Sequence, residues 1–360
     1  MKILVLNYEY PPLGGGGSKV SEELCEQCGN RGISIDIVTM GYKELPQKEK
    51  RGNIVIHRVK CWRSKQRVCH PWEQLSYCIN AYRYIGKHLD VGKYDFVHCH
   101  FIIPTGLLAL WLKKKYGLKY MITSHGSDVL GHNDARFLLL YKLIAPGWKK
   151  ILANASAITA PSEYLVNKIH ETMPDILVDI IANGIHCKDY RPGNKKKTVI
   201  AMTRLQESKG VQDLIEACAA IDMHEWTVVI LGDGPYRPNL EALVKQKGLE
   251  NKIRFGGHVT GDERMKYLSE AGCFFSGSRF EAFSLSVLEA SLCGCNVIAS
   301  KIEPHIMLVG QEHTYEVVDE LKSILSSVVS GEPEAVEYGN EKYDWENIYE
   351  KYETLYRGMS

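Results

Sequence analysis

The segment SRFEAFSLSVLEASLCG, residues 278–294, carries two glutamates eight positions apart in a mostly apolar context. Each carboxylate, Glu281 and Glu289, can accept hydrogen bonds from a pair of neighbouring hydroxyl groups. If a helix begins near Ser284, Glu289 lies roughly 6 to 8 Å further along its axis. The spacing therefore predicts contacts with both ends of one elongated, hydroxyl-rich ligand. The alternative is that Glu289 is a buried, satisfied acid and Glu281 a charge at the helix entry.

Two cations, Arg204 and Lys209, stand in the segment TRLQESKG between an expected strand and an expected helix. A guanidinium fork and an ammonium point charge at one sheet edge suit a diphosphate. The amides of Phe283, Ser284 and Leu285 form the expected helix N-terminus, which can hold phosphate or sugar oxygens. The alternative is that both cations are solvated loop residues.

Four consecutive glycines, Gly14–Gly17, separate the first expected strand from a helix. Glycine lets the backbone approach a ligand closely, and a helix N-terminus favours phosphate. The alternative is a flexible turn. A nicotinamide-binding fingerprint fits poorly, because the glycines form a solid block and Asp36 lies within the second strand rather than at its end.

Histidines follow two further strands. His125, in TSHGSDV, is expected at the carboxyl edge of the sheet, where it can donate to a hydroxyl or a phosphate. His98 and His100, in VHCH, lie on the same side of a strand. No other ligand cluster stands nearby in the sequence, so we predict no metal site.

Short apolar runs rich in β-branched residues recur between helical segments, which predicts an α/β protein with buried parallel strands. In the first half these runs are 2–8, 34–40, 53–59, 95–100, 119–126, 156–162 and 177–185; in the second half they are 197–204, 226–234, 252–258, 272–278 and 296–300. The pattern occurs twice, so we expect two doubly wound Rossmann-like domains. Ligands bind beyond the carboxyl ends of such strands, which predicts a cleft between the domains.

A polar, basic join at 186–197 sets the domain boundaries. We expect an N-terminal domain over 1–187, a C-terminal domain over 188–342, and a final helix over 343–360 that crosses back to the first domain. Residues 1–187 hold 24 Lys and Arg against 16 Asp and Glu, a net +8, whereas residues 188–360 hold 20 against 27, a net −7. The basic half suits an anionic partner, or the two domains attract each other.

Several classes of protein are disfavoured. No apolar run reaches the length of a membrane-spanning helix, and the N-terminus lacks the features of a signal peptide. The eleven cysteines are odd in number and mostly in apolar contexts, which is typical of reduced thiols in a cytosolic protein.

Taken in order, these motifs resemble the "group 1" family of retaining, GT-B fold glycosyltransferases, glycosyltransferase family four. The matching residues are the Gly14–Gly17 loop, HCHF, SHGSD, APS, NGI, TRLQESKG, LGDGP and FEAFSLSVLEA leading to CGCNVIAS. The resemblance covers nearly the whole chain. It departs from the family at Ala282, where glycine is usual, and at KIEPHIM (301–307), where paired glycines often stand.

The resemblance implies transfer of a hexosyl unit from a UDP- or GDP-sugar, with retention of configuration and with neither a metal ion nor a cofactor. It implies that Arg204 and Lys209 pair with the diphosphate, Glu281 with the sugar and Glu289 with the ribose. The other implied contacts are Gly15 and Gly16 at the diphosphate, Phe283, Ser284 and Leu285 on the sugar and phosphate, Gly257, His258 and Val259 beside the base, and His125 by the sugar and acceptor.

The acceptor is expected on the basic N-terminal domain. Residues 57–72 hold five Lys and Arg together with Trp62 and Trp72, a composition that suits a membrane interface. We expect a glycan or lipid-linked acceptor, in synthesis of cell-envelope polysaccharide or glycolipid. We also expect a cytoplasmic enzyme, peripheral on the inner face of an anionic cell membrane. The alternative is a solvated loop, and no motif supports nucleic-acid binding.

Two other functions use the same fold. A nucleotide-sugar epimerase would need a base near the sugar, and the sequence offers no evident second acid near His125. A non-catalytic nucleotide-sugar binding protein would bind without turnover. The combination of Arg204, Lys209 and Glu281 favours the transferase.

Overall fold

The computed structural model describes residues 1–66, 68–132 and 138–359. The chain forms two compact units, one made of Met1–Gly184 together with the segment from Trp345 onward, and one made of Ile185–Asp344. The units therefore change at 184/185 and at 344/345, whereas the boundaries expected from the sequence follow residues 187 and 342.

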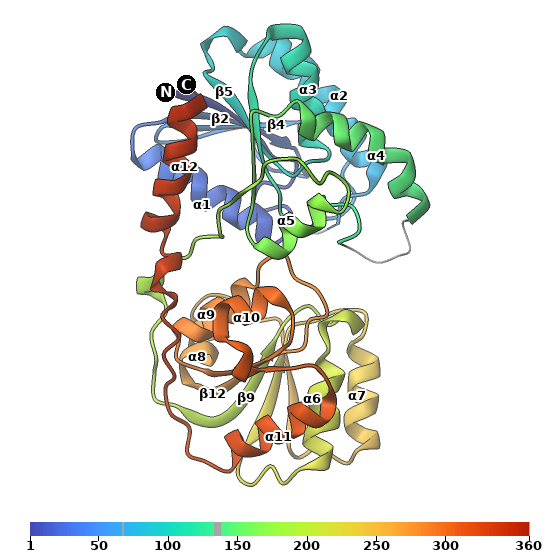
Figure 1. The fold of residues 1–360 in the computed structure, drawn as a ribbon, viewed down its shortest axis with the longest axis vertical. Helices are drawn as coiled ribbons and strands as arrows, with labels where there is room; N and C mark the ends of the chain where they lie inside the picture. Colours follow the sequence, from blue (N-terminus) through green and yellow to red (C-terminus); the bar gives the residue numbers. More distant parts are fainter. Residues whose placement is uncertain (67, 133–137, 360) are drawn as a thin grey trace. The chain divides into compact units, whose positions relative to one another are not determined.

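The first unit is built on an eight-stranded sheet in the order β3-β4-β2-β1-β5-β6-β7-β8 (Figure 1). Its strands are β1 (Lys2–Leu6), β2 (Ser34–Met40), β3 (Lys48–Arg51), β4 (Ile54–Val59), β5 (Phe96–His100), β6 (Tyr120–Thr123), β7 (Ala157–Ala160) and β8 (Asp179–Ile180). Every neighbouring pair is parallel except β3 with β4. Strands β5 and β6 are buried along their whole length, and β1 is buried from Ile3 onward, as their continuous apolar runs predict.

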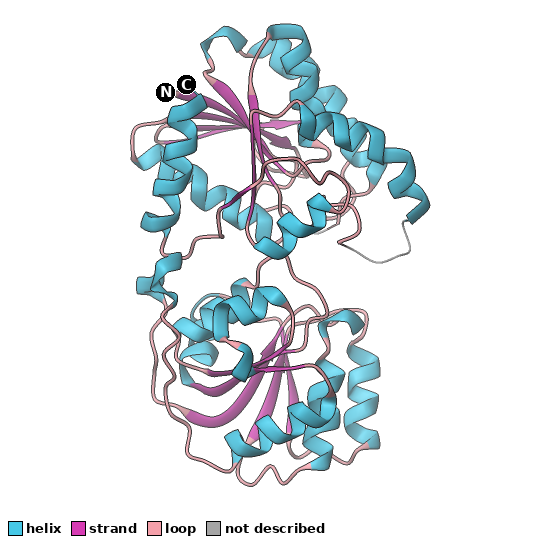
Figure 2. Cartoon of the chain, viewed as in Figure 1, coloured by secondary structure: helices cyan, strands magenta, loops and turns pink. Residues whose placement is uncertain are grey.

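Helices cover this sheet in two groups (Figure 2). They are α1 (Gly16–Asn30), α2 (Pro71–His88), α3 (Thr105–Tyr116), α4 (Leu138–Ala153), α5 (Glu163–His170) and α12 (Trp345–Met359). Helices α2, α3 and α4 pack side by side, and α1 packs against α12. The arrangement is doubly wound.

The second unit has a six-stranded parallel sheet in the order β11-β10-β9-β12-β13-β14. Its strands are β9 (Lys196–Met202), β10 (Thr227–Leu231), β11 (Ile253–Gly257), β12 (Ala271–Ser276), β13 (Asn296–Ser300) and β14 (Thr314–Tyr315), and its helices are α6 (Val211–Ala220), α7 (Arg237–Gln246), α8 (Gly261–Glu270), α9 (Leu285–Leu292), α10 (Glu303–Val309) and α11 (Val318–Val329). Side chains of α6, α7 and α11 share one apolar core with the sheet. The expectation of two Rossmann-like α/β domains is confirmed.

Two strands lie outside the apolar runs that the sequence singles out. Strand β3 reads KEKR and pairs antiparallel with β4 at the sheet edge. A charged edge strand lacks the apolar signal of a buried one, because its side chains face solvent and protect the edge from further pairing. Strand β14 is two residues long, too short for any periodicity.

Close backbone contacts hold the loops at the carboxyl edge of the second sheet. Gly210, with φ +66°, precedes α6, and a Cβ there would lie 2.0 Å from the carbonyl oxygen of Gly277. Gly232, after β10, approaches the Thr203 carbonyl oxygen as closely, at 1.9 Å from a Cβ. Only glycine fits these positions, so the loops after β9, β10 and β12 lie against one another.

Helix α12 is anchored in the first unit by aromatic side chains. The Tyr356 hydroxyl lies 2.9 Å from His98 Nδ1 on β5, and the Tyr352 hydroxyl 3.4 Å from Thr123 Oγ1 on β6. At its start the Trp345 ring leaves no room for a Cβ on Gly184. The aromatic pattern of the last segment therefore serves to fix this helix on the sheet.

All eleven cysteines are free thiols. Within the described ranges, no helix combines the length and apolar character that crossing a membrane would need.

Replacing Tyr356 with Phe should lower the free energy of unfolding by about 1–2 kcal/mol, because the buried His98 Nδ1 would lose its partner. Urea denaturation measures this. Tyr349→Phe, on the same helix, is the matched control, since the Tyr349 hydroxyl bonds to no residue that the structure describes. Its cost should stay within about 0.5 kcal/mol. Equal costs for the two variants would contradict the assigned role of the bond.

Candidate functional site

Lys209 and Glu281 meet at the carboxyl edge of the second sheet. Lys209 ends a 3-10 turn, Glu207–Lys209, just before α6, and Glu281 lies in the loop between β12 and α9. The Lys209 Nζ donates to Glu281 Oε1 at 2.7 Å, and the two side chains are 20% and 22% exposed. A partly exposed ion pair contributes at most about 1 kcal/mol. A ligand that satisfies both charges can therefore replace it at little cost.

Arg204, the other predicted cation, is not drawn into this pair. It follows β9, its side chain is exposed, and it makes no side-chain hydrogen bond or ion pair within the described residues. The structure thus pairs one of the two predicted cations with Glu281 and leaves the other available in solvent.

The N-terminus of α9 is uncapped. Ser284 is its N-cap residue but makes no capping bond, and the buried Ser284 hydroxyl has no partner among the described residues. The amides of Leu285, Ser286 and Val287 likewise have no acceptor among the described residues, whereas the Leu288 amide donates to the Ser284 carbonyl. Phe283 packs beside the Tyr343 ring, with centroids 5.7 Å apart, and fixes the entry to the helix. The start of α9 therefore gathers a hydroxyl and backbone amides that can donate to the oxygen atoms of a ligand.

Glu289 is held on both oxygens by residues that the sequence did not single out. Arg264 of α8 is hydrogen-bonded to Oε2, and the Tyr190 hydroxyl donates to Oε1 at 3.1 Å. Burial acts to lower the pKa of Arg264, but the Glu289 carboxylate outweighs it and raises that pKa. Glu289 is therefore an oriented carboxylate rather than a bare one. Its partners lie 25 and 99 residues away in sequence, beyond any local pattern.

The loop that carries Glu281 is fastened to α6 by Arg279. The Arg279 amide donates to the Ser208 carbonyl at 2.9 Å, and its guanidinium lies 2.8 Å from the buried Asp213. Asp213 also accepts from the Tyr315 hydroxyl at 2.9 Å. The sequence did not single out Arg279, Asp213 or Tyr315. Asp213 in particular looks like an ordinary helix-start residue, because acids are common in the first turn of a helix.

Two other predicted regions border the same edge. At the end of β11, the Gly257 carbonyl accepts from the Gly232 amide at 2.6 Å. The next residue, His258, is exposed, and Val259 after it is buried. In the 301–307 segment, which departs from the family pattern, the buried His305 bonds through Nδ1 to the Ser300 carbonyl at 3.0 Å. A buried, hydrogen-bonded histidine therefore lies in the segment where the family often has paired glycines.

In the first unit the glycine-rich loop lies against His125. A Cβ on Gly17 would lie 2.9 Å from the His125 ring, so this position requires glycine. Gly15 is the N-cap of α1, and a Cβ there would meet nothing within 4 Å, whereas Gly16 is the first residue of the helix. Packing against His125 therefore accounts for glycine at position 17, whereas no neighbouring atom requires glycine at position 15.

His125 belongs to a cluster of three histidines. Its Nε2 lies 3.0 Å from His100 Nδ1, and the His98 and His100 ring centroids are 4.5 Å apart. Burial lowers the pKa of His98 and of His125 to about 3, and that of His100 well below its usual value. His125 is therefore a neutral imidazole near pH 7, able to donate or accept one hydrogen bond.

The backbone around His125 is strained and braced. Phe101, just after β5, adopts φ +78°, a left-handed conformation that costs an ordinary residue about 1–3 kcal/mol. This places its ring 4.7 Å from the His125 ring and 5.1 Å from the Tyr8 ring. Asp128 spans the region, accepting from the Ile102 amide at 2.7 Å and the His125 amide at 3.0 Å. Asp128 braces the backbone here, since both its oxygens are engaged.

The basic segment 57–72 is only partly available to a partner. Arg58 is buried against Glu49 at 2.8 Å, and Arg63 is buried against Glu9 at 3.1 Å. Of the other three basic residues, Lys60 and Lys65 are exposed, and position 67 lies outside the described residues.

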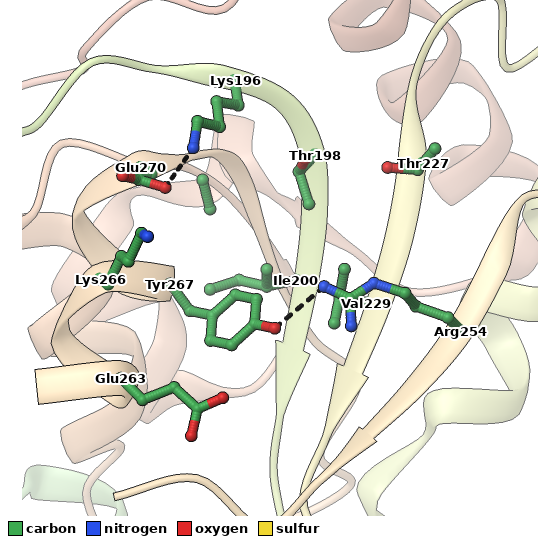
Figure 3. A pocket seen from close by; sticks show the side chains of 11 residues that line it. Lys196, Thr198, Ile200, Thr227, Val229, Arg254, Glu263, Lys266, Tyr267 and Glu270 are labelled. Carbon is green, nitrogen blue, oxygen red and sulfur yellow. Dashed lines mark hydrogen bonds and ion pairs between the residues drawn. The ribbon is translucent and has the colours of Figure 1, made fainter. Parts of the chain in front are cut away.

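A pocket of about 350 Å³ opens on the second unit (Figure 3). Its floor is Ile200 and Val229 on the sheet, and α8 forms one wall. Two of its three cations are engaged, since Arg254 donates to the Tyr267 hydroxyl at 2.9 Å and Lys196 to Glu270 at 2.5 Å, and Lys266 is the third. None of the predicted site residues lines this pocket.

Two family profiles match the chain. The one described as "Glycosyl transferases group 1" matches residues 185–341, and "Glycosyltransferase Family 4" matches residues 14–189. One relative is the N-acetyl-alpha-D-glucosaminyl L-malate synthase of Bacillus anthracis. It is 27% identical over 316 residues, which is 81% of this chain and 77% of the relative.

Solved structures show the same architecture. Sucrose-phosphate synthase from Thermosynechococcus elongatus superposes with a TM-score of 0.81 at 18% identity, over 99% of this chain and 98% of that one. Anabaena HepE, solved in complex with UDP-glucose, superposes with a TM-score of 0.74 at 18% identity, over 99% and 100%. The fold is GT-B, as the resemblance implied.

Stability should fall as pH drops below about 6.5, because the buried histidines take up protons when unfolded but not when folded. Their contribution is complete above the unfolded pKa and is lost progressively toward the folded pKa of about 3. His125→Gln removes one such group. Calorimetry at about pH 7.5 and pH 5.5 should show a stability loss smaller than wild type by about 1.4 kcal/mol. The exposed His88→Gln should keep the wild-type slope, and an unchanged slope for His125→Gln would contradict the buried neutral state.

Proposed function

Because the chain belongs to the group 1 glycosyltransferases of family four, we propose that it transfers a hexosyl unit from a UDP- or GDP-sugar with retention of configuration. The proposal includes metal-independent transfer to a glycan or lipid-linked acceptor. A UDP donor is favoured by the similarity to HepE, whose structure contains UDP-glucose.

One observation supports the proposal most strongly: Glu281, which is paired with Lys209, lies in the loop that leads directly into the uncapped start of α9. The pair offers a cation for phosphate and a carboxylate for sugar hydroxyls. The buried Ser284 hydroxyl and the first helix amides offer unsatisfied donors. A sugar diphosphate would satisfy all of these groups, and few other small ligands carry both kinds of complement.

Glu289 is proposed to hold the ribose. Arg264 and Tyr190 each take up one position on its two oxygens, which orients the carboxylate and leaves acceptor capacity on each. A ribose presents two adjacent hydroxyls that match this remaining capacity. The backbone at Gly257 and Val259, with His258, is proposed to border the base.

The diphosphate is the leaving group, so stabilising its developing charge lowers the barrier. We assign this to Arg204, to Lys209 and to the amides of Phe283, Ser284 and Leu285. In the first unit, Gly15 and Gly16 are proposed to approach the diphosphate. The neutral His125 is proposed to hydrogen-bond the sugar or the acceptor hydroxyl.

The acceptor is proposed to be a glycan or a lipid-linked sugar used in building cell-envelope polysaccharide or glycolipid. The basic N-terminal half, with a net charge of +8 from 24 cations and 16 acids over residues 1–187, supports an anionic acceptor or membrane environment. The enzyme would then work on the cytoplasmic side, at the inner face of the cell membrane.

A thermal-shift screen with UDP, GDP, ADP and their sugars tests the donor. A ligand at a hundred times its Kd stabilises the folded protein by about 2.7 kcal/mol, so the correct base stands out. With the donor known, NMR of the product anomer tests retention, and transfer that persists in EDTA tests metal independence.

Lys209→Ala and Glu281→Ala should each lower transfer by about a hundredfold or more, because each removes a group aimed at the diphosphate or sugar. Lys247→Ala is the matched control, since Lys247 forms a comparable ion pair with Glu216 in the same unit, at 2.6 Å. It should retain wild-type activity. Wild-type rates in both site variants would refute the assignment, and donor isomerisation without acceptor would indicate an epimerase instead.

A further inference from the structure

Helix α2 presents an apolar stripe to solvent. Trp72, Leu75 and Ile79 are 58%, 52% and 39% exposed, at a spacing that places them on one helix face. Trp62, 70% exposed, is tied to the same stretch, because its amide donates to the Ser76 hydroxyl at 2.9 Å. We call Trp62, Trp72, Leu75 and Ile79 the tryptophan face.

The surroundings of the tryptophan face are cationic. From residue 52 to residue 89 the sequence contains a single acid, Glu73. Its carboxylate is buried at the start of α2, where it accepts from the amides of Ser64 and His70, both at 2.8 Å. No exposed carboxylate therefore offsets the positive charge of the described part of this stretch. The exposed cations there are Lys60, Lys65, Arg83 and Lys87.

This combination fits the surface of an anionic lipid bilayer. Tryptophan favours the interfacial region of a bilayer, leucine and isoleucine enter its apolar boundary, and the cations pair with lipid phosphates. A second copy of the chain fits poorly, because a two-fold contact would oppose two faces with the same positive charge.

The segment that carries Trp62 is bonded directly to the glycine-rich loop. Gln66 donates from its side chain to the Pro12 carbonyl at 2.8 Å, and its own carbonyl accepts from the Gly14 amide at 3.1 Å. Arg63 adds the buried ion pair with Glu9. Immobilising residues 61–66 would therefore restrain the loop at residues 12–14.

We propose that the tryptophan face docks on an anionic lipid bilayer, and that docking steadies the glycine-rich loop through residues 61–66. The docking itself is independent of the chemistry at the donor site. The effect on catalysis rests on the proposed function, in which Gly15 and Gly16 approach the donor diphosphate.

Vesicle co-sedimentation tests the docking. The full chain should bind phosphatidylcholine vesicles that contain phosphatidylglycerol, bind pure phosphatidylcholine much more weakly, and lose binding at high salt. Trp72→Ala with Leu75→Ser should weaken binding about tenfold. Leu177→Ser is the matched control, because Leu177 is 91% exposed in the same unit and lies outside the face.

Hydrogen exchange tests the connection to the loop. Anionic vesicles should slow amide exchange in peptides that span residues 8–18. Gln66→Ala should bind vesicles as wild type does but lose at least half of that protection, because the bond to Pro12 is gone. Protection that is unchanged in Gln66→Ala would overturn the connection.

Failure to bind anionic vesicles would overturn the docking, and so would equal binding to both lipid compositions. Concentration-dependent self-association that Trp72→Ala abolishes, without vesicle binding, would assign the face to a protein interface instead. Vesicle binding by a chain that binds no nucleotide would refute the proposed function and leave the docking intact.

Discussion

The close backbone contact between Gly210 and Gly277 is the constraint on which the candidate site of the second unit depends. A Cβ at Gly210 would lie 2.0 Å from the Gly277 carbonyl oxygen, so the loops after β9 and β12 meet without side chains between them. Lys209 and Glu281 flank this contact, and their ion pair follows from it. A second, partly buried bond, from Arg279 to the buried Asp213 of α6, then fastens the loop after β12 to the helix that follows Lys209. The close approach of the two backbones thus fixes the distance between the loops, and the Lys209–Glu281 ion pair depends on that distance.

The charged groups of the site are paired before any ligand arrives. Lys209 and Glu281 satisfy each other, and Arg264 and Tyr190 hold Glu289. Such pairs restrict side-chain rotation, so the protein's side chains lose less conformational entropy when a ligand binds. Because the Lys209–Glu281 pair is partly exposed, exchanging it for ligand contacts costs little. The more buried Glu289 keeps its partners, which suits a group that must be positioned rather than displaced.

The first unit relies on burial rather than on ion pairs. Three histidines lie close enough that protonating them together would place like charges in a low-dielectric interior, and burial keeps them neutral. The final helix contributes directly, because Tyr356 bonds to His98 at the far side of the cluster. The last residues of the chain thus support the environment of His125, although about 230 positions of sequence separate the two.

The α/β class, the two Rossmann-like domains and the strands at the centre of both sheets could be predicted from the sequence, because buried parallel strands leave continuous apolar runs. The sequence also identified Lys209, Glu281 and His125 as residues at strand or helix ends, and Glu289 as a residue one and a half turns into a helix. The partners of these side chains became evident only from the folded chain. Arg264, Tyr190 and Asp213 carry no local signal, since each acts on a residue of another element. His100 stands out in the sequence, but its contact with His125 comes only from the fold. The charged strand β3 and the burial of Arg58 and Arg63 could not be predicted from the sequence either. The composition gives the number of charges, whereas the packing decides whether each charged side chain faces solvent or the interior.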